Sequence, residues 1–513
     1  MQGEPPGFSR GEDVSKTQPG GGSLLVIDVG TSTLRAAIVR PDASIEHTCR
    51  VGISPATPAS GLVEFDAQQV ADAVEQAANA ALSKGGPVAG VGIANQRSTT
   101  VVWERSTGRP VAPAIGWQDL RTVGTCLELQ EKGFRAPPNA SATKLAAILD
   151  MVDPGRDRAG DDLCFGTIDT WVAWTLSGGV RGAALHVTDA TNAAVTSMVS
   201  PTTLNWDSDI LDILGIPASM MPTIVDSCGV VGEALILDGA PPICGIAGDQ
   251  QASLIGQGCT VEGAAKVTLG TGGMLDMCTG ENRPERFDKG PAGTFPIVAW
   301  QRGGTPVWGV EAVMLSAGSC IEWLRDDLGF FRDASESESL ASTCTDTGDV
   351  WFVPSLLGIG TPVWDFGARG TLLGLTRGTG RPEVTRAVLE GVAHRSCDLL
   401  EASENDTGLS VRALRIDGGM SANSLLVTAI SNYSGRPVEV SPVLEATTLG
   451  AGFLAGIAVG TWNDESDAAS AFTPARRVEP TIGDSARSAL RQRWLDARSR
   501  AEKTIPELSG ITF

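Results

Sequence analysis

Asp249 is the residue of this chain best suited to acid–base chemistry. It lies in the run GIAGDQQASLIGQ (residues 245–257), beside Gln250 and directly after an apolar stretch typical of a buried strand. A carboxylate at the end of such a strand can accept the proton of a substrate hydroxyl. The structural alternative is that Asp249 caps the N-terminus of the helical segment that follows.

A glycine-rich turn that could bind phosphate lies near the start of the chain. The string DVGTSTLR (residues 28–35) places Asp28 at a strand end, then a glycine and three hydroxyl side chains. The glycine lets backbone N–H groups approach an anion, and Asp28 could hold Mg²⁺ through water. A β-hairpin with a polar turn explains the same residues without any ligand.

Two similar turns follow Asp249. DGGMSAN (residues 417–423) has the order strand, Gly-Gly, helix start, which suits a nucleotide phosphate or ribose, and GTGGML (residues 270–275) allows the same interpretation. Tight turns with positive φ, at Gly418 and Gly419 for example, are the simpler explanation. Each motif alone is weak. Three of them around one aspartate predict ATP-dependent phosphoryl transfer in a cleft between two lobes.

Arg97 and Trp117 are further candidates for a binding pocket. Arg97 follows a predicted buried strand at residues 88–95, and the apolar residues on both sides of it argue against a surface position. Trp117 could form the wall of a pocket, although composition favours a place in the core. The histidines lie in unrelated segments and indicate neither a metal site nor a catalytic triad: His47, His186 and His394.

The elements that would position these residues follow an α/β pattern. Strands at residues 24–29, 33–40 and 44–53 predict a meander, and a helix from Asp66 to Leu82 leads into the buried strand. The pattern begins again after residues 256–261. The later part is predicted to contain a β segment at 264–277, helices at 311–328 and 384–400, a strand–turn–helix at 415–426, a small-residue helix at 447–460 and a charged helix at 485–503.

Length and composition limit the class of protein. A chain of 513 residues predicts two or more domains. The formal net charge of −21 argues against a nucleic-acid partner or an anionic membrane surface. Ten cysteines without a CxxC pair indicate neither a disulfide framework nor a zinc site, and mostly buried thiols are expected. Residues 1–23 predict a disordered tail, not a signal peptide, and no stretch has the length of a membrane span, so we expect a cytoplasmic protein.

These strings, in this order, resemble the FGGY carbohydrate kinases, and among them the glycerol kinases. The resemblance runs from about Leu24 to Trp462 and includes FGTIDTW (165–171), HVTDATNA (186–193) and GLTRG (374–378). It implies an α/β fold of two ribonuclease-H-like (actin-like ATPase) domains flanking a catalytic cleft. Residues 24–257 would carry the polyol site and a phosphate loop, and residues 258–513 would bind the nucleotide.

The resemblance also implies a role for each matching residue. Asp249 would be the general base, and Asp28 with Asp249 would hold Mg²⁺. The positions implied for polyol binding are Arg97, Ser98, Trp117, Asn139, Asp249, Gln250 and Met274. Those implied for ATP are Thr31, Ser32, Thr33, Arg35, Thr271, Gly318, Glu322, Gly419 and Asn423.

Three of the polyol positions depart from the glycerol kinase pattern. Ser98 replaces a glutamate that binds substrate hydroxyls, Asn139 replaces a tyrosine, and Met274 replaces a phenylalanine. Losing a charged hydrogen bond costs about 1.5–3 kcal/mol, or about 10- to 100-fold in affinity. A wider, less aromatic pocket is therefore expected. Residues 234–244 lack the basic residues of an allosteric sugar-bisphosphate loop, which predicts no such regulation.

The leading hypothesis is an ATP-dependent kinase that phosphorylates a terminal hydroxyl of a small polyol, with glycerol to glycerol 3-phosphate as the first choice. A kinase for another small polyol or sugar, such as a four-carbon polyol, is the close alternative because of the three changed positions. A non-catalytic, actin-like ATP-binding protein is the third hypothesis, and retention of Asp249, Arg97 and Gln250 argues against it. The resemblance suggests a homodimer or homotetramer.

Overall fold

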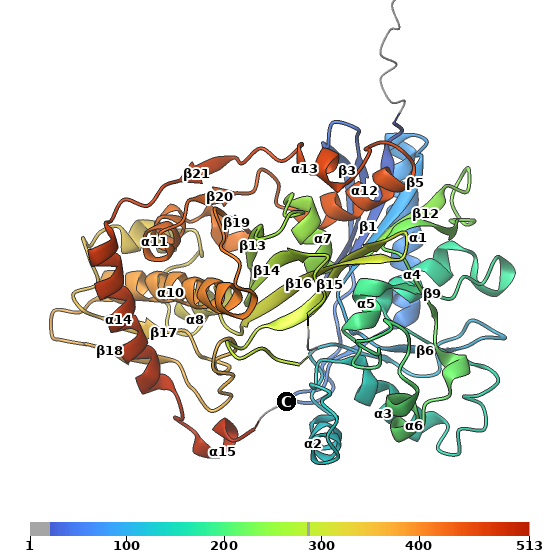
Figure 1. Ribbon diagram of the computed structural model, residues 1–513, viewed down its shortest axis with the longest axis horizontal. Coiled ribbons are helices and arrows are strands. Elements are labelled where there is room, and N and C mark those ends of the chain that lie inside the picture. Colours follow the sequence, from blue (N-terminus) through green and yellow to red (C-terminus); the bar gives the residue numbers. More distant parts are fainter. Residues whose placement is uncertain (1–20, 285–287, 512–513) are drawn as a thin grey trace, which may run out of the picture.

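The computed structural model describes residues 21–284 and 288–511, so most of the predicted tail at 1–23 lies outside the described residues. In the described part of the chain, thirteen strands form one sheet that runs through the whole molecule (Figure 1). Its spatial order is β21-β20-β19-β13-β14-β16-β15-β11-β12-β5-β1-β2-β3. The strands are β1 (Leu24–Val29), β2 (Thr33–Val39), β3 (Ile45–Gly52), β5 (Gly90–Asn95), β11 (Cys228–Glu233), β12 (Pro242–Gly248), β13 (Ala265–Leu269), β14 (Gly273–Gly280), β15 (Phe295–Arg302), β16 (Thr305–Met314), β19 (Leu414–Asp417), β20 (Val438–Val440) and β21 (Arg476–Val478).

The predicted meander is confirmed at one end of this sheet. β1 pairs antiparallel with β2, and β2 with β3, because each apolar run is separated from the next by a short polar turn. β5 lies parallel to β1 and to β12, so the carboxyl ends of these three strands meet at one edge. Asp28 in β1 and Ala247 in β12 are both aligned with Ala94 in β5. The residues that follow these strands are therefore brought together.

The later part of the chain adds an antiparallel set of strands to the same sheet. β14 pairs with β13 on one side and with β16 on the other, and β19 lies parallel to β13. Figure 1 shows β14, β16 and β15 in the middle of the molecule, between the N-terminal strands and the C-terminal helices. The helices used below are α1 (Ala67–Gly85), α3 (Ser141–Val152), α7 (Asp249–Gly256), α8 (Gly318–Asp326), α10 (Arg381–Thr407), α11 (Ser424–Ser434), α12 (Ala446–Ala458) and α14 (Asp484–Ala501).

The helix predicted at residues 311–328 is wrong in its first part. Residues up to Met314 belong to β16, and the helix α8 begins only at Gly318. The apolar residues used for the prediction do follow a helical spacing beyond Ala317. Upstream of it, β16 lies between β14 and β15, and pairing on both sides decides the local structure.

The small-residue helix predicted at residues 447–460 is confirmed as α12, which packs against α7 and against β12, β5 and β1. Glycines on the sheet allow this close approach. A Cβ atom on Gly92 would lie 2.6 Å from the carbonyl oxygen of Ala451, and one on Gly245 would lie 2.4 Å from the backbone nitrogen of Ala455. α12, from late in the chain, thus covers strands β1, β5 and β12 from its first half.

The other predicted helices are also found. Asp66 caps α1 by accepting hydrogen bonds from two backbone N–H groups, and the long helix predicted at 384–400 is the centre of α10. All ten cysteines are free, and eight of them are buried, as predicted. Among the described residues, no helix is both long and apolar enough to cross a membrane.

Candidate active site

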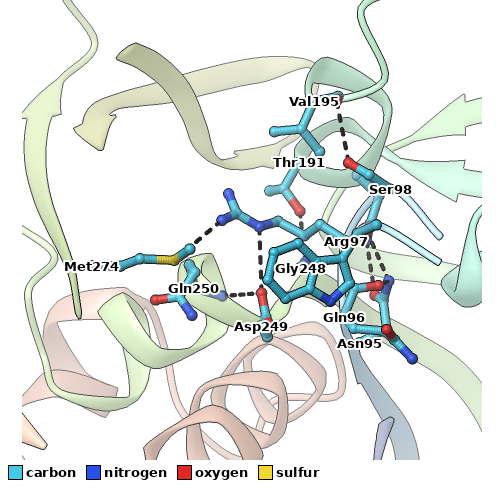
Figure 2. A network of polar contacts seen from close by, with 12 residues as sticks. Asn95, Gln96, Arg97, Ser98, Thr191, Val195, Gly248, Asp249, Gln250 and Met274 are labelled. Carbon is cyan, nitrogen blue, oxygen red and sulfur yellow. Dashed lines mark hydrogen bonds and ion pairs between the residues drawn. The ribbon is translucent and has the colours of Figure 1, made fainter. Parts of the chain in front are cut away.

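Asp249 lies where the sequence predicts it, immediately after the strand β12. It is the first residue of α7, and the N-cap position belongs to Gly248, so the interpretation of Asp249 as a helix cap is wrong. Its Oδ1 atom accepts a hydrogen bond from the backbone N–H of Gln250 at 2.8 Å (Figure 2). This contact fixes the direction of a carboxylate that is one-third exposed.

Arg97 connects Asp249 to the opposite side of the site. Its Nε lies 3.3 Å from Oδ1 of Asp249, and its Nη2 lies 2.6 Å from Oε2 of Glu311. Nη2 also contacts the sulfur of Met274 at 3.9 Å (Figure 2). The side chain is only 12% exposed, which confirms that Arg97 is not a surface arginine. Its charge lies between two carboxylates.

The chain of contacts closes through three neighbouring strands. Glu311 of β16 lies opposite Asp276 of β14, and Asp276 lies opposite Lys266 of β13. The Lys266 ammonium is 2.7 Å from Asp276 and donates a hydrogen bond to Oε1 of Gln250 at 2.6 Å. Lys266 and Asp276 are fully buried. We call the closed set of six residues the charged ring: Arg97, Asp249, Gln250, Lys266, Asp276 and Glu311.

Burial raises the proton affinity of two carboxylates in the charged ring, Asp249 and Asp276. It raises the pKa of Asp249, although Arg97 and the N–H of Gln250 act in the opposite direction. It raises the pKa of Asp276 to about 7, opposed mainly by the charge of Lys266. The pKa of Arg97 is raised, because nearby carboxylates, Glu311 first, outweigh the cost of burying its charge. Arg97 therefore stays protonated.

Asp28 lies at the end of β1 and is 4% exposed. Arg35 approaches it to 3.6 Å, and the hydroxyl of Thr448 in α12 donates to it at 3.3 Å. Burial raises the pKa of Asp28 to about 6; Arg35 lowers it, and the negative charge of Asp249 raises it further. Two carboxylates that repel each other at the same sheet edge are a donor set that suits a divalent cation.

The turn after Asp28 forms a hairpin with hydroxyl groups at its tip. The N–H of Gly30 donates to the carbonyl of Thr33 at 3.1 Å, and Ser32 is exposed. The indole N–H of Trp117 donates to the hydroxyl of Thr31 at 3.3 Å. Trp117 is half-buried at the site, so the expectation that it belongs to the core is wrong.

The second glycine turn meets the start of α8. The N–H groups of Ala317 and Ser319 donate to the carbonyl of Thr271, and that of Gly318 donates to Gly270. Gly418 belongs to the same edge, because a Cβ atom there would lie 2.4 Å from the carbonyl oxygen of Leu269. The turn at residues 270–275 therefore lies beside both the start of α8 and the turn at residues 417–423.

The remaining positions predicted to bind ATP lie around these turns. Gly418 has φ of 85°, as predicted, whereas Gly419 is in a short helical turn, so its predicted positive φ is wrong. Asn423 caps α11 and accepts a hydrogen bond from the N–H of Leu426. Glu322 lies on the exposed face of α8, one turn after Gly318.

Ser98 and Asn139 occupy the edge of the site. Ser98 is 3% exposed with φ of 63°, a backbone conformation that stores strain in residues other than glycine. Its hydroxyl donates to the carbonyl of Val195 at 3.4 Å, and its own carbonyl accepts from the hydroxyl of Ser141. Asn139 is exposed two residues before Ser141, and its carbonyl accepts a hydrogen bond from the buried Lys144. No contact joins Asn139 to the charged ring among the described residues.

Sequence reasoning missed four residues of this site. Lys266, Asp276 and Glu311 are single charged residues within the apolar strands β13, β14 and β16, and Thr448 lies on the buried face of α12. A charged residue inside a buried strand is costly unless it is paired, so these positions carried a signal. The pairing itself depends on strand register, which the sequence does not reveal.

Known proteins with similar sequences cover almost the whole chain. The glycerol kinase of Aromatoleum aromaticum is 41% identical over 495 residues, which are 93% of this chain and 98% of that protein. The glycerol kinase of Bacillus subtilis is 40% identical over 492 residues, with 92% and 98% covered. A crystal structure of the Plasmodium falciparum glycerol kinase with ADP superposes with a TM-score of 0.86 at 27% identity, covering 93% of this chain and 98% of the other.

Two family models match consecutive parts of the chain. Residues 23–256 match the N-terminal domain of the FGGY family of carbohydrate kinases, and residues 265–459 match its C-terminal domain. The expected α/β fold of two actin-like domains agrees with these matches and with the superposed structure. The chain belongs to the FGGY family of carbohydrate kinases.

Proposed function

We propose that this kinase transfers the γ-phosphoryl group of ATP to a terminal hydroxyl of a small polyol, with glycerol as the first candidate. The observation that supports this most directly is Asp249, held between Arg97 and the N–H of Gln250 at the sheet edge. The glycerol kinases that this chain resembles at about 40% identity support the choice of substrate class. A non-catalytic ATP-binding protein would have no use for this arrangement.

In the proposed reaction, Asp249 accepts the proton of the substrate hydroxyl as its oxygen attacks the γ-phosphate. Arg97 uses Nε and Nη2 in the described contacts, which leaves the N–H groups of Nη1 to donate to substrate hydroxyls. Gln250 is held by Lys266, which donates to its side-chain oxygen and so leaves its amide N–H groups as the donors for a substrate hydroxyl. Met274 supplies an apolar wall.

The phosphates and the nucleotide would bind at the glycine turns. We assign Thr31, Ser32, Thr33 and Arg35 to the phosphates, because the hairpin presents hydroxyl groups and a guanidinium beside Asp28. The nucleotide positions are assigned on the second edge: Thr271, Gly318, Glu322, Gly419 and Asn423.

Asp28 and Asp249 are the residues that would hold Mg²⁺. The negative charge of Asp249 raises the pKa of Asp28, and a divalent cation held by both carboxylates would relieve this repulsion. When bound, the cation would neutralise charge on the phosphates. Asp28 is oriented for this by Thr448, which donates to one of its oxygens.

A second candidate substrate is a slightly larger polyol, such as a four-carbon one. It is favoured by the small Ser98, whose hydroxyl is directed to Val195, and by the exposed position of Asn139. Both leave the pocket without the charged and aromatic groups that a three-carbon polyol would contact.

The test is the rate of ADP release with glycerol, erythritol, threitol, dihydroxyacetone and pentitols. A kcat/KM for glycerol far above all others would exclude the second candidate. No polyol-stimulated ADP release with any compound would overturn the proposed function. Phosphorus NMR of the product checks that the phosphate is on a terminal hydroxyl.

We also propose the division into domains at residues 24–257 and 258–513, which the separate family matches at 23–256 and 265–459 support. A homodimer or homotetramer and a cytoplasmic location remain predictions. Sedimentation at several concentrations and cell fractionation would test them.

A further inference from the structure

The cations of the charged ring are all compensated by carboxylates of the protein. Lys266 forms an ion pair with Asp276 at 2.7 Å, and both side chains are fully buried. Arg97 has two carboxylate partners, Asp249 at 3.3 Å and Glu311 at 2.6 Å. Two cations thus face three carboxylates. When all are ionised, the side chains of the ring by themselves carry one excess negative charge beside the proposed substrate hydroxyl.

Glu311 is the source of this excess. Asp249 is needed for proton transfer and Asp276 balances Lys266, but Glu311 contacts neither the backbone N–H of Gln250 nor the ammonium of Lys266 in the described contacts. Glu311 lies closer to Arg97 than Asp249 does, at 2.6 Å against 3.3 Å. Its negative charge compensates the guanidinium, which could otherwise form an ion pair with an anionic ligand. Arg97 can still donate hydrogen bonds to neutral hydroxyls through Nη1.

We propose that Glu311 is a specificity-determining residue that restricts this kinase to uncharged polyols and excludes compounds of the same length with a carboxylate. The inference rests on the proposed function, because it places the substrate between Arg97 and Asp249. A carboxylate there would meet an excess negative charge in a poorly solvated site. A unit charge a few ångströms away changes the affinity for an anion by about 10- to 100-fold at the effective dielectric of such sites.

The test compares two competitive inhibitors of equal shape. D-glycerate and D-glyceramide differ in charge but hardly in size, and their inhibition constants are measured against the best polyol substrate. The assay is run at about pH 8, above the pKa of about 7 at Asp276, so that Asp276 is ionised. If a longer polyol is preferred, the aldonate and aldonamide of that length replace this pair.

In the wild type we expect the amide to bind about 10- to 100-fold more tightly than the acid. Glu311→Gln should reduce this preference by a similar factor, mainly by improving the affinity for the acid. Glu390→Gln is the matched control, because Glu390 is a comparably buried partner of an arginine, Arg386 at 2.8 Å, on the distant helix α10. It should leave the preference unchanged.

Asp276→Asn provides a second reading in case Glu311→Gln does not fold, since it removes another charge of the ring and should reduce the preference less strongly. An unchanged acid-to-amide ratio in the folded variants overturns the proposal for Glu311. It leaves the proposed function intact, provided that the wild type phosphorylates a polyol. If the wild type phosphorylates none, the proposed function has failed instead, and direct titration with the two inhibitors still tests the charge preference.

Discussion

Asp249 has an environment that suits a base, because burial raises its pKa while Arg97 and a backbone N–H limit the rise. We predict that Asp249→Asn lowers kcat by about 10²- to 10⁴-fold with little change in KM, measured by ADP release. In the wild type, kcat/KM should fall as the pH is lowered through a pKa above the usual range of an aspartate. Asp238→Asn, on the surface, is the control. Equal activity of Asp249→Asn and wild type would refute the mechanism.

The buried carboxylate of Asp28 should lower the free energy of unfolding at neutral pH, although the proposed reaction needs it. Its folded pKa of about 6 lies above the ordinary aspartate value of 3.8, so its ionised form is disfavoured in the fold, and stability is lost as the pH rises through this interval. Asp28→Asn should therefore raise the free energy of unfolding by about 1–3 kcal/mol near pH 7.5, with a smaller gain near pH 5, while activity is lost. Urea unfolding at both pH values measures this. A loss of stability at pH 7.5 would contradict it.

At the scale of single residues, local strings indicate the candidate reactive groups but not the residues that hold them. Asp249, Arg97 and Gln250 were identified from local strings, and the structure brings them together. The sequence pattern assigns Glu311 to a helix, whereas it is a strand residue that forms an ion pair with Arg97. Its partner comes from another strand far away in the chain, and only the register of the sheet reveals such a contact.

At the scale of strands, variants of the buried ion pair between Lys266 and Asp276 can separate the free energy of ion pairing from the cost of burying each charge. Asp276→Leu leaves a fully buried ammonium without its ion-pair partner and should destabilise the protein by about 3–5 kcal/mol. The double variant Lys266→Met/Asp276→Leu removes both charges and should recover most of this loss. Thermal unfolding of the wild type, both single variants and the double variant measures the coupling. Additive losses would show that the pair does not interact.

The packing of α12 on the sheet leads to a prediction about one methyl group. Gly245→Ala would place a Cβ atom 2.4 Å from the backbone of Ala455, which cannot move without shifting the helix. We expect a loss of about 1–3 kcal/mol from overpacking, seen as a lower Tm. Gly52→Ala is the control, because nothing lies within 4 Å of the corresponding Cβ position in β3. Equal Tm values for the two variants would show that α12 adjusts freely.

Elements with a local cause were predictable from the sequence, and those with a long-range cause were not. The meander and α1 follow from short turns and from the cap at Asp66, and all of them were predicted. The prediction of a helix at the end of β16 is wrong because the apolar residues there fit both a helical and a strand period. Pairing with β14 and β15 on either side selects the strand. The continuity of one sheet through both halves was not predicted either, since no local pattern records it.

At the scale of the whole molecule, we expect no activation or inhibition by a sugar bisphosphate. Residues 234–244 contain neither lysine nor arginine, and the chain has a net charge of −21, so nothing there attracts a ligand with two phosphates. Addition of fructose 1,6-bisphosphate at millimolar concentration should leave kcat/KM unchanged within about twofold. A saturable change in kcat/KM larger than this would disprove the prediction.

The position of α12 has a consequence for how the protein is made. The face of β1, β5 and β12 that α12 covers is complete once Gly248 has been synthesised, but the helix emerges about 200 residues later. At about 5–20 residues per second, this apolar face waits roughly 10–40 s on the ribosome. The first half of the chain therefore depends on the last part of synthesis, and premature termination before residue 446 should yield an aggregating fragment.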